Sequence, residues 1–228
     1  MFENFNQQGN SMDYPREQKS FSLWILLLSF ASGYANVAAM TRFNQPVSHM
    51  TGTVSSLALA IFEREAFLVE RLLSLLMCFL AGAIFAGILF HKRKIEPKKR
   101  YGALLFIGGV IIFVLKNSEV LFYVLGFFMG LQNAMLLDYR GHLIRSTHIT
   151  GYLSDIGFEM GSFLVGEPRH AWKIVFYTLS IFLFVLGGLF SVYFYSQGNQ
   201  VELLSGIYIL LGSSYFYLRR EELLKKKQ

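Results

Sequence analysis

Four segments of this chain are apolar and contain no Asp, Glu, Lys or Arg over 18 to 22 residues. They are residues 21–40, 72–90, 120–137 and 174–195. An uncharged apolar run of about 18 residues or more can cross the hydrocarbon core of a bilayer as a helix, because each residue adds about 1.5 Å. Two shorter segments, 101–115 and 203–218, can cross only where flanking residues snorkel or the bilayer thins. The sequence therefore predicts an all-α integral membrane protein.

The composition agrees with this class. Hydrophobic residues make up 54 % of the chain, above the roughly 45–50 % of soluble domains. The net charge of +6 comes from basic residues in loops beside the predicted spans, where they contact anionic lipid, so no nucleic-acid partner is expected. The single cysteine, Cys78, lies inside an apolar run, which argues against a disulfide framework or a thiolate metal site. No cofactor is expected.

A polar tetrad, His-x-Thr-Gly, occurs twice, at His49–Gly52 and His148–Gly151. Upstream of each copy, a glycine is followed three residues later by an asparagine, in Gly33–Asn36 and Gly130–Asn133. The glycine precedes the threonine of the tetrad by 18 residues in the first copy and by 20 in the second. This spacing predicts an internal repeat. We expect a flexible cytoplasmic tail at 1–20, membrane repeats at 21–116 and 117–218, and a basic cytoplasmic tail at 219–228.

Two strongly basic segments determine the predicted orientation. Residues 91–100 hold six basic residues against one acidic, residues 219–228 hold five against two, and 196–200 carries no charge. Basic segments beside spans remain in the cytoplasm. Eight crossings would place the two basic segments on opposite sides, whereas six crossings place both inside if each tetrad segment enters the membrane and returns. We predict six full spans and two re-entrant or broken helices, with an inverted second repeat and both termini cytoplasmic.

The tetrads are candidates for a binding site. A helix that begins inside the membrane presents free backbone N–H groups and the positive end of its dipole, which favour an anion or a polar oxygen. In an inverted pair, the two helix starts would face one another and form halves of one site. The candidate substrate-binding residues are His49, Thr51, Gly52, Thr147, His148, Thr150 and Gly151, with the amides Asn36, Gln132 and Asn133. Alternatively, the threonines only cap helices, the histidines bond to neighbouring backbone, and the amides join helices.

Two carboxylates follow the second tetrad. Asp155 and Glu159 are one helical turn apart, and the corresponding residues of the first copy are uncharged. Carboxylates at membrane depth are candidates for proton or cation coupling. Alternatively, they reach the cytoplasmic interface or pair with a nearby arginine, namely Arg140, Arg145 or Arg169. The two tetrad histidines alone do not predict a metal site, because no third ligand at a recognisable spacing accompanies them.

The sequence carries no catalytic motif. G-x-S-x-G, H-E-x-x-H and phosphate-binding loops are absent, so we expect no enzyme. The predicted function is secondary transport of a small polar or anionic solute by alternating access. The alternative is a non-transporting membrane protein, such as an assembly factor or sensor, whose polar centre is structural; an intramembrane enzyme is a third reading. The partners expected are the lipid bilayer and the solute, and the chain is compatible with a homo-oligomer.

Several stretches of the chain resemble the YoaK family of bacterial multi-pass membrane proteins, also called DUF1275. They are SGYANV, VSHMTGTVSSLAL, FLAGAIFAGIL, MGLQNAM and RSTHITGYLSDIG, which lie within residues 21–195. The resemblance implies a protein of the bacterial cytoplasmic membrane and supplies no activity. Relatives commonly have Asn after the first Thr-Gly, where this chain has Thr53. Asn36 replaces a carboxylate that could couple protons in relatives.

Overall fold

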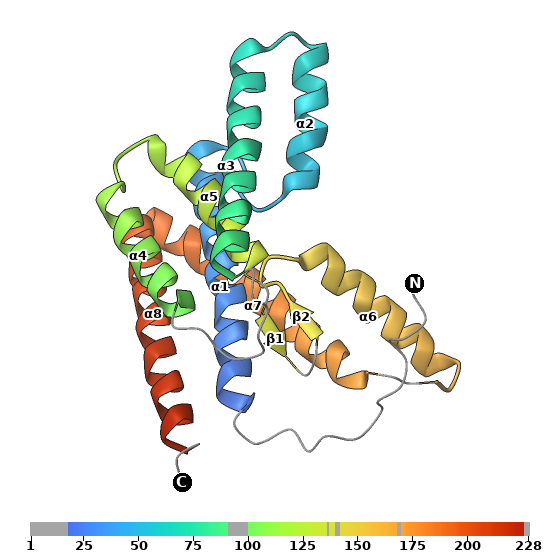
Figure 1. Ribbon diagram of the computed structural model, residues 1–228. Helices are drawn as coiled ribbons and strands as arrows, with labels where there is room; N and C mark the ends of the chain where they lie inside the picture. The colour runs from blue at the N-terminus through green and yellow to red at the C-terminus, as the bar shows by residue number, and fades with distance from the viewer. Residues whose placement is uncertain (1–17, 91–99, 136, 140–141, 168–169, 226–228) are drawn as a thin grey trace.

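The structure is a computed structural model that describes residues 18–90, 100–135, 137–139, 142–167 and 170–225. Within these residues, the chain forms eight helices and one short antiparallel hairpin (Figure 1). The helices are α1 (Gln18–Phe43), α2 (Met50–Phe62), α3 (Ala66–Phe90), α4 (Arg100–Val114), α5 (Val120–Ala134), α6 (Ile149–Leu164), α7 (Ala171–Ser196) and α8 (Gln200–Lys225). The strands are β1 (Leu137–Tyr139) and β2 (His142–Ile144). The helical class is as predicted, and the hairpin is a small exception to an all-α chain.

Four helices are long and apolar enough to cross a membrane, which is consistent with a helical membrane protein. They are α1 over Ser22–Phe43, α3, α7, and α8 over Gln200–Leu218. The predicted span at 120–137 is shorter than expected, because α5 ends at Ala134 and the chain turns into β1. The predicted short segment at 203–218 belongs to a longer helix, which begins at Gln200 and carries Glu202, paired with Lys116, in its first turn.

The helices pack mainly across the two halves of the chain. The most extensive contacts join α1 to α7, α3 to α5, and α4 to α8. By contrast, α2 packs on α3, and α6 packs on α7, in each case the next helix in the sequence. Both α2 and α6 extend away from the body in Figure 1. Helices α1 and α5 are the first of their halves, and α3 and α7 are the third. The first helix of each half therefore packs against the third helix of the other half.

A Phe-x-x-Gly sequence occurs at each of these two crossings, once on each helix. The four copies at these crossings are Phe30–Gly33, Phe79–Gly82, Phe127–Gly130 and Phe184–Gly187. A Cβ on Gly33 would lie 2.0 Å from the carbonyl oxygen of Phe184, and one on Gly187 would lie 2.0 Å from that of Phe30. The corresponding glycines of α3 and α5 have the same relation, with both distances at 1.9 Å. Only glycine permits these backbones to approach so closely.

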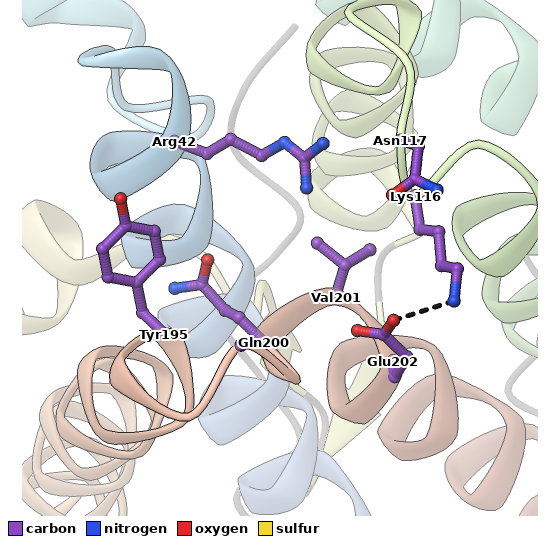
Figure 2. Close-up of a pocket in the computed structure, with 8 residues that line it drawn as sticks. Arg42, Lys116, Asn117, Tyr195, Gln200, Val201 and Glu202 are labelled. Atoms are coloured by element: carbon purple, nitrogen blue, oxygen red, sulfur yellow. Dashed lines mark hydrogen bonds and ion pairs between the residues drawn. The ribbon is translucent and has the colours of Figure 1, made fainter.

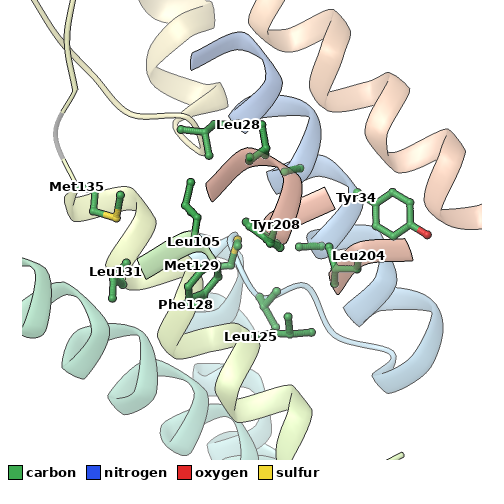
Figure 3. Packing of buried hydrophobic residues seen from close by; sticks show 14 of the residues in the cluster. Leu28, Tyr34, Leu105, Leu125, Phe128, Met129, Leu131, Met135, Leu204 and Tyr208 are labelled. Atoms are coloured by element: carbon green, nitrogen blue, oxygen red, sulfur yellow. The ribbon is translucent and has the colours of Figure 1, made fainter. Parts of the chain in front are cut away.

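The core lies where α1, α4, α5 and α8 meet (Figure 3). Leu28 of α1, Leu105 of α4, Leu125 and Met129 of α5 and Tyr208 of α8 each expose 1 % or less of their surface. The apolar window of α1 is 67 % buried, against 22 % for that of α3. The first helix is therefore central, and the outer helices direct large apolar side chains outward, as lipid contact requires.

Candidate functional site

Helices α2 and α6 begin in the same way. Their N-cap residues are His49, with φ −101° and ψ 67°, and His148, with φ −93° and ψ 58°. The first helical hydrogen bonds run from Thr53 N–H to the carbonyl of His49 and from Tyr152 N–H to that of His148, both at 3.0 Å. Thr51 and Thr150 consequently lie in the first turn, where both are exposed. The suggestion that these threonines cap the helices is wrong, because each helix begins one residue before its threonine.

The glycine of each tetrad gives room to the histidine of the same tetrad. A Cβ on Gly52 would lie 2.2 Å from Cδ2 of His49, and a Cβ on Gly151 would lie 2.0 Å from Cδ2 of His148. Each imidazole ring therefore packs against the first turn of its own helix, beside the glycine three residues after the histidine. Both histidines are exposed. The His-x-x-Gly spacing of the tetrad therefore has a structural reason: the histidine ring packs over a glycine that has no Cβ.

The predicted asparagines hold the segments that precede the tetrads. The Oδ1 atom of Asn36 accepts hydrogen bonds from the backbone N–H of Val47 at 3.1 Å, and from the N–H and hydroxyl of Ser48 at 3.0 and 2.9 Å. In the second half, Asn133 Oδ1 accepts a bond of 2.8 Å from the hydroxyl of Thr147. The same amide-to-hydroxyl bond thus anchors both tetrads, one residue before the histidine.

Gln132 lies deeper, at 2 % exposure, and its amide is fully engaged. Its Nε2 donates to the hydroxyls of Ser32 at 2.8 Å and Ser146 at 3.0 Å, and its Oε1 accepts from the hydroxyl of Tyr208 at 3.0 Å. These bonds join α1, α5, α8 and the loop before α6. Of the two roles predicted for this amide, the geometry favours joining helices. The sequence reading missed its three partners, because no local pattern marks them.

A family model described as "Protein of unknown function (DUF1275)" matches residues 24–215, from α1 into α8. The chain belongs to the DUF1275 family. This confirms the family resemblance inferred from the repeated tetrads and the glycine-bearing segments. Neither a curated protein nor a solved structure matches the chain. The family description names no activity, so function in this DUF1275 protein must be argued from the site itself.

The two predicted coupling carboxylates of the DUF1275 chain lie in different surroundings. Glu159 is 5 % exposed and accepts a bond of 3.1 Å from the backbone N–H of His170, and Lys173 Nζ lies 3.4 Å from its carboxylate. These donors stabilise the ionised form of this buried carboxylate. Asp155 is exposed, and no cation lies within ion-pair distance of it among the described residues.

Of the proposed arginine partners, Arg145 forms no ion pair with Glu159, and Arg140 and Arg169 lie outside the described residues. Glu159 pairs instead with residues at the start of α7, so it holds α6 and α7 together. In the part of the chain that the structure describes, no three His, Cys, Asp or Glu side chains are grouped as metal ligands. The basic segment 91–100 and the first tail also lie largely outside this part.

Proposed function

We propose that this DUF1275 protein is a secondary transporter of a small polar or anionic solute, and that the two tetrad helix starts form its binding site. The observation that carries the proposal is the twofold occurrence of one local structure: an N-cap histidine, a glycine beneath its ring, and an anchoring asparagine. The N–H groups of residues 50–52 and 149–151 precede the first helical bonds. Such groups, at the positive end of a helix dipole, bind anions or polar oxygens.

The packing of α4 and α8 supports an inverted repeat. A Cβ on Gly102 would lie 2.8 Å from the carbonyl oxygen of Gly212, and one on Gly212 would lie 2.6 Å from that of Gly102. Gly109, further along α4, contacts Ser205, earlier in α8, so the helices are antiparallel. Equivalent helices that meet reciprocally and antiparallel are expected from a twofold axis in the membrane plane. In this arrangement, six helices cross and α2 and α6 each enter and leave on one side. Figure 1 shows α2 and α6 extending away from one another.

The rival reading is a non-transporting membrane protein with a structural polar centre. Gln132 favours this reading. Its side-chain amide is buried, and both its nitrogen and its oxygen form hydrogen bonds to other side chains of the protein. The tetrads differ from this amide, because His49, Thr51, His148 and Thr150 are all exposed. A ligand can therefore reach the helix starts without disrupting the core, which favours a ligand-binding role for the tetrads over a structural one.

A ligand screen tests the proposed site. We expect at least one small anion or polar metabolite to raise the Tm of the detergent-purified protein by about 5–10 °C at 100 times its Kd, the shift that about 2.7 kcal/mol of binding would give. The double variant Gly52→Ala with Gly151→Ala should lose this response, because each added Cβ displaces an imidazole from the helix start. Uptake of the same compound into proteoliposomes then distinguishes transport from binding.

The control for this screen is Gly87→Ala, because a Cβ on Gly87 would meet no atom within 4 Å. This variant should respond to the ligand as the wild type does. A folded tetrad double variant that retains the full response would contradict the proposed site and favour the structural rival. Binding without uptake would favour a sensor.

Topology is tested by cysteine labelling in a Cys78→Ser background. We propose a protein of the bacterial cytoplasmic membrane with both termini inside, which follows from the basic segments of the sequence. A cysteine at Gly198 should react with an impermeant maleimide from outside intact cells. Cysteines at Lys98 and Gln228 should react only after the cells are opened. Labelling of Gly198 and Gln228 from the same side would contradict the six-span arrangement.

A further inference from the structure

A polar pocket of about 230 Å³ lies at one end of the helices, apart from the tetrads (Figure 2). It is formed by the end of α1, the turn between α4 and α5, and the turn between α7 and α8. Its polar lining residues are Arg42, Lys116, Asn117, Tyr195, Gln200 and Glu202. No tetrad residue lines it, so its chemistry can be considered independently of the proposed transport site.

In the described part of the chain, the charges in this pocket leave one cation without a carboxylate at ion-pair distance, namely Arg42, whose guanidinium lies 5.7 Å from the centre of the Phe43 ring. Lys116 Nζ lies 2.9 Å from Glu202 Oε1, so these two side chains neutralise one another. Arg42 is exposed, and among the described residues no carboxylate lies within ion-pair distance of it. Figure 2 shows its guanidinium directed across the pocket toward Asn117 and Lys116. The pocket therefore holds a net positive charge.

The base of the pocket is rigid. Gln200 is 4 % exposed, and its Nε2 donates to the hydroxyls of Thr41 and Ser191, both at 2.9 Å. Its backbone carbonyl accepts a bond of 3.0 Å from the hydroxyl of Tyr34. Because α8 begins at Gln200, the positive end of the dipole of this 26-residue helix lies at the pocket, where Glu202 in the first turn already supplies one negative charge.

We propose that this pocket binds a small oxyanion, a carboxylate or a phosphate. The guanidinium of Arg42 is the principal ligand, because its planar fork of donors matches two oxygens of such an anion. Lys116 contributes less to anion binding, because its ammonium group is already paired with Glu202. The inference goes beyond the proposed function, since it needs neither transport nor the tetrads. A free anion and the phosphate of a lipid headgroup share this chemistry, and both can reach the end of a membrane helix.

Two variants with opposite expected effects test the proposal. The probe is inorganic phosphate, titrated into delipidated protein in neutral detergent by calorimetry, with chloride keeping the ionic strength constant. Arg42→Gln should weaken phosphate binding at least tenfold, because a charge-assisted pair is lost. Glu202→Gln should strengthen it about three- to tenfold, because it removes a negative charge and frees Lys116. General destabilisation cannot produce changes of opposite sign.

Arg64→Gln is the matched control, because Arg64 is exposed in the turn after α2 and does not line the pocket. It should bind phosphate as the wild type does. The tetrad double variant should retain the phosphate binding that Arg42→Gln removes, which separates this pocket from the transport site. Nanodiscs with and without phosphatidylglycerol then identify the source of the anion. If phosphatidylglycerol competes with phosphate, the natural ligand is a lipid headgroup. If it does not compete, the natural ligand is a free anion. Equal binding by wild type and Arg42→Gln, or no binding of phosphate, acetate or phosphatidylglycerol, would overturn the proposal.

Discussion

Replacing Gly33 by alanine should destabilise the protein by about 3 kcal/mol or more, at the upper end of the cost of overpacking. The added Cβ would lie 2.0 Å from the carbonyl oxygen of Phe184, and a backbone atom cannot rotate away as a side chain can. The conflict is relieved only if α1 and α7 separate, and this is one of the most extensive helix contacts in the fold. Unfolding in mixed micelles with increasing denaturing detergent measures the loss.

Two further variants give this prediction its controls. Gly87→Ala introduces a Cβ into open space on α3, so it should be neutral or stabilise the helix by up to about 1 kcal/mol. Gly130→Ala places a Cβ 1.9 Å from the carbonyl oxygen of Phe79, at the corresponding crossing of the other half. It should cost as much as Gly33→Ala. A loss at one crossing only would mean that the two halves are not equivalent in energy.

The helices that the sequence predicted best are those whose ends depend on local composition. The apolar runs at 21–40, 72–90 and 174–195 lie within α1, α3 and α7, because hydropathy and charge act within one segment. The lengths of α5 and α8 could not be predicted in the same way. The first ends where the chain turns into the β hairpin, and the second extends at both ends into polar residues that an apolar run leaves out.

The repeated tetrads show which structural features a local sequence pattern can predict and which it cannot. Their similarity correctly indicated that Asn36 and Asn133 play equivalent parts, and the structure places each beside the hydroxyl that precedes its tetrad. The helix start was missed by one or two residues, because threonine is the better N-cap by intrinsic preference. A contact between a histidine ring and a glycine three residues later is a packing effect, which capping preferences do not contain.

Other features required the three-dimensional structure. The anion pocket brings together side chains from the end of α1, the α4–α5 turn and the start of α8, which are far apart in the chain. The Phe-x-x-Gly sequences of the two crossings are visible in the chain, but so are three others, at 106–109, 158–161 and 163–166, so the pattern alone does not mark a crossing. The phenylalanine contributes its backbone carbonyl to the crossing, so residue type alone does not mark the contact.

Replacing Gln132 by alanine should cost about 3–5 kcal/mol, the range for truncating a large buried side chain, because it also leaves hydrogen-bonding groups without partners. The hydroxyls of Ser32, Ser146 and Tyr208 all bond to this amide. In a membrane protein, no bulk water can replace the lost bonds. Thermal unfolding in a single detergent, followed by tryptophan fluorescence and by aggregation, measures the change.

Tyr208→Phe is the control for Gln132→Ala, because it removes one donor and leaves the packed ring in place. It should cost about 1–3 kcal/mol, because the buried Oε1 of Gln132 loses the donor that Tyr208 supplies. The larger variant should also impair the second tetrad more than the first, since Ser146 is adjacent to Thr147, which Asn133 holds. Hydrogen exchange should therefore rise at the start of α6 before it rises at the start of α2. Equal costs for the two variants, or equal exchange at both helix starts, would mean that Gln132 does not support the second tetrad and that each tetrad is held by its own asparagine alone.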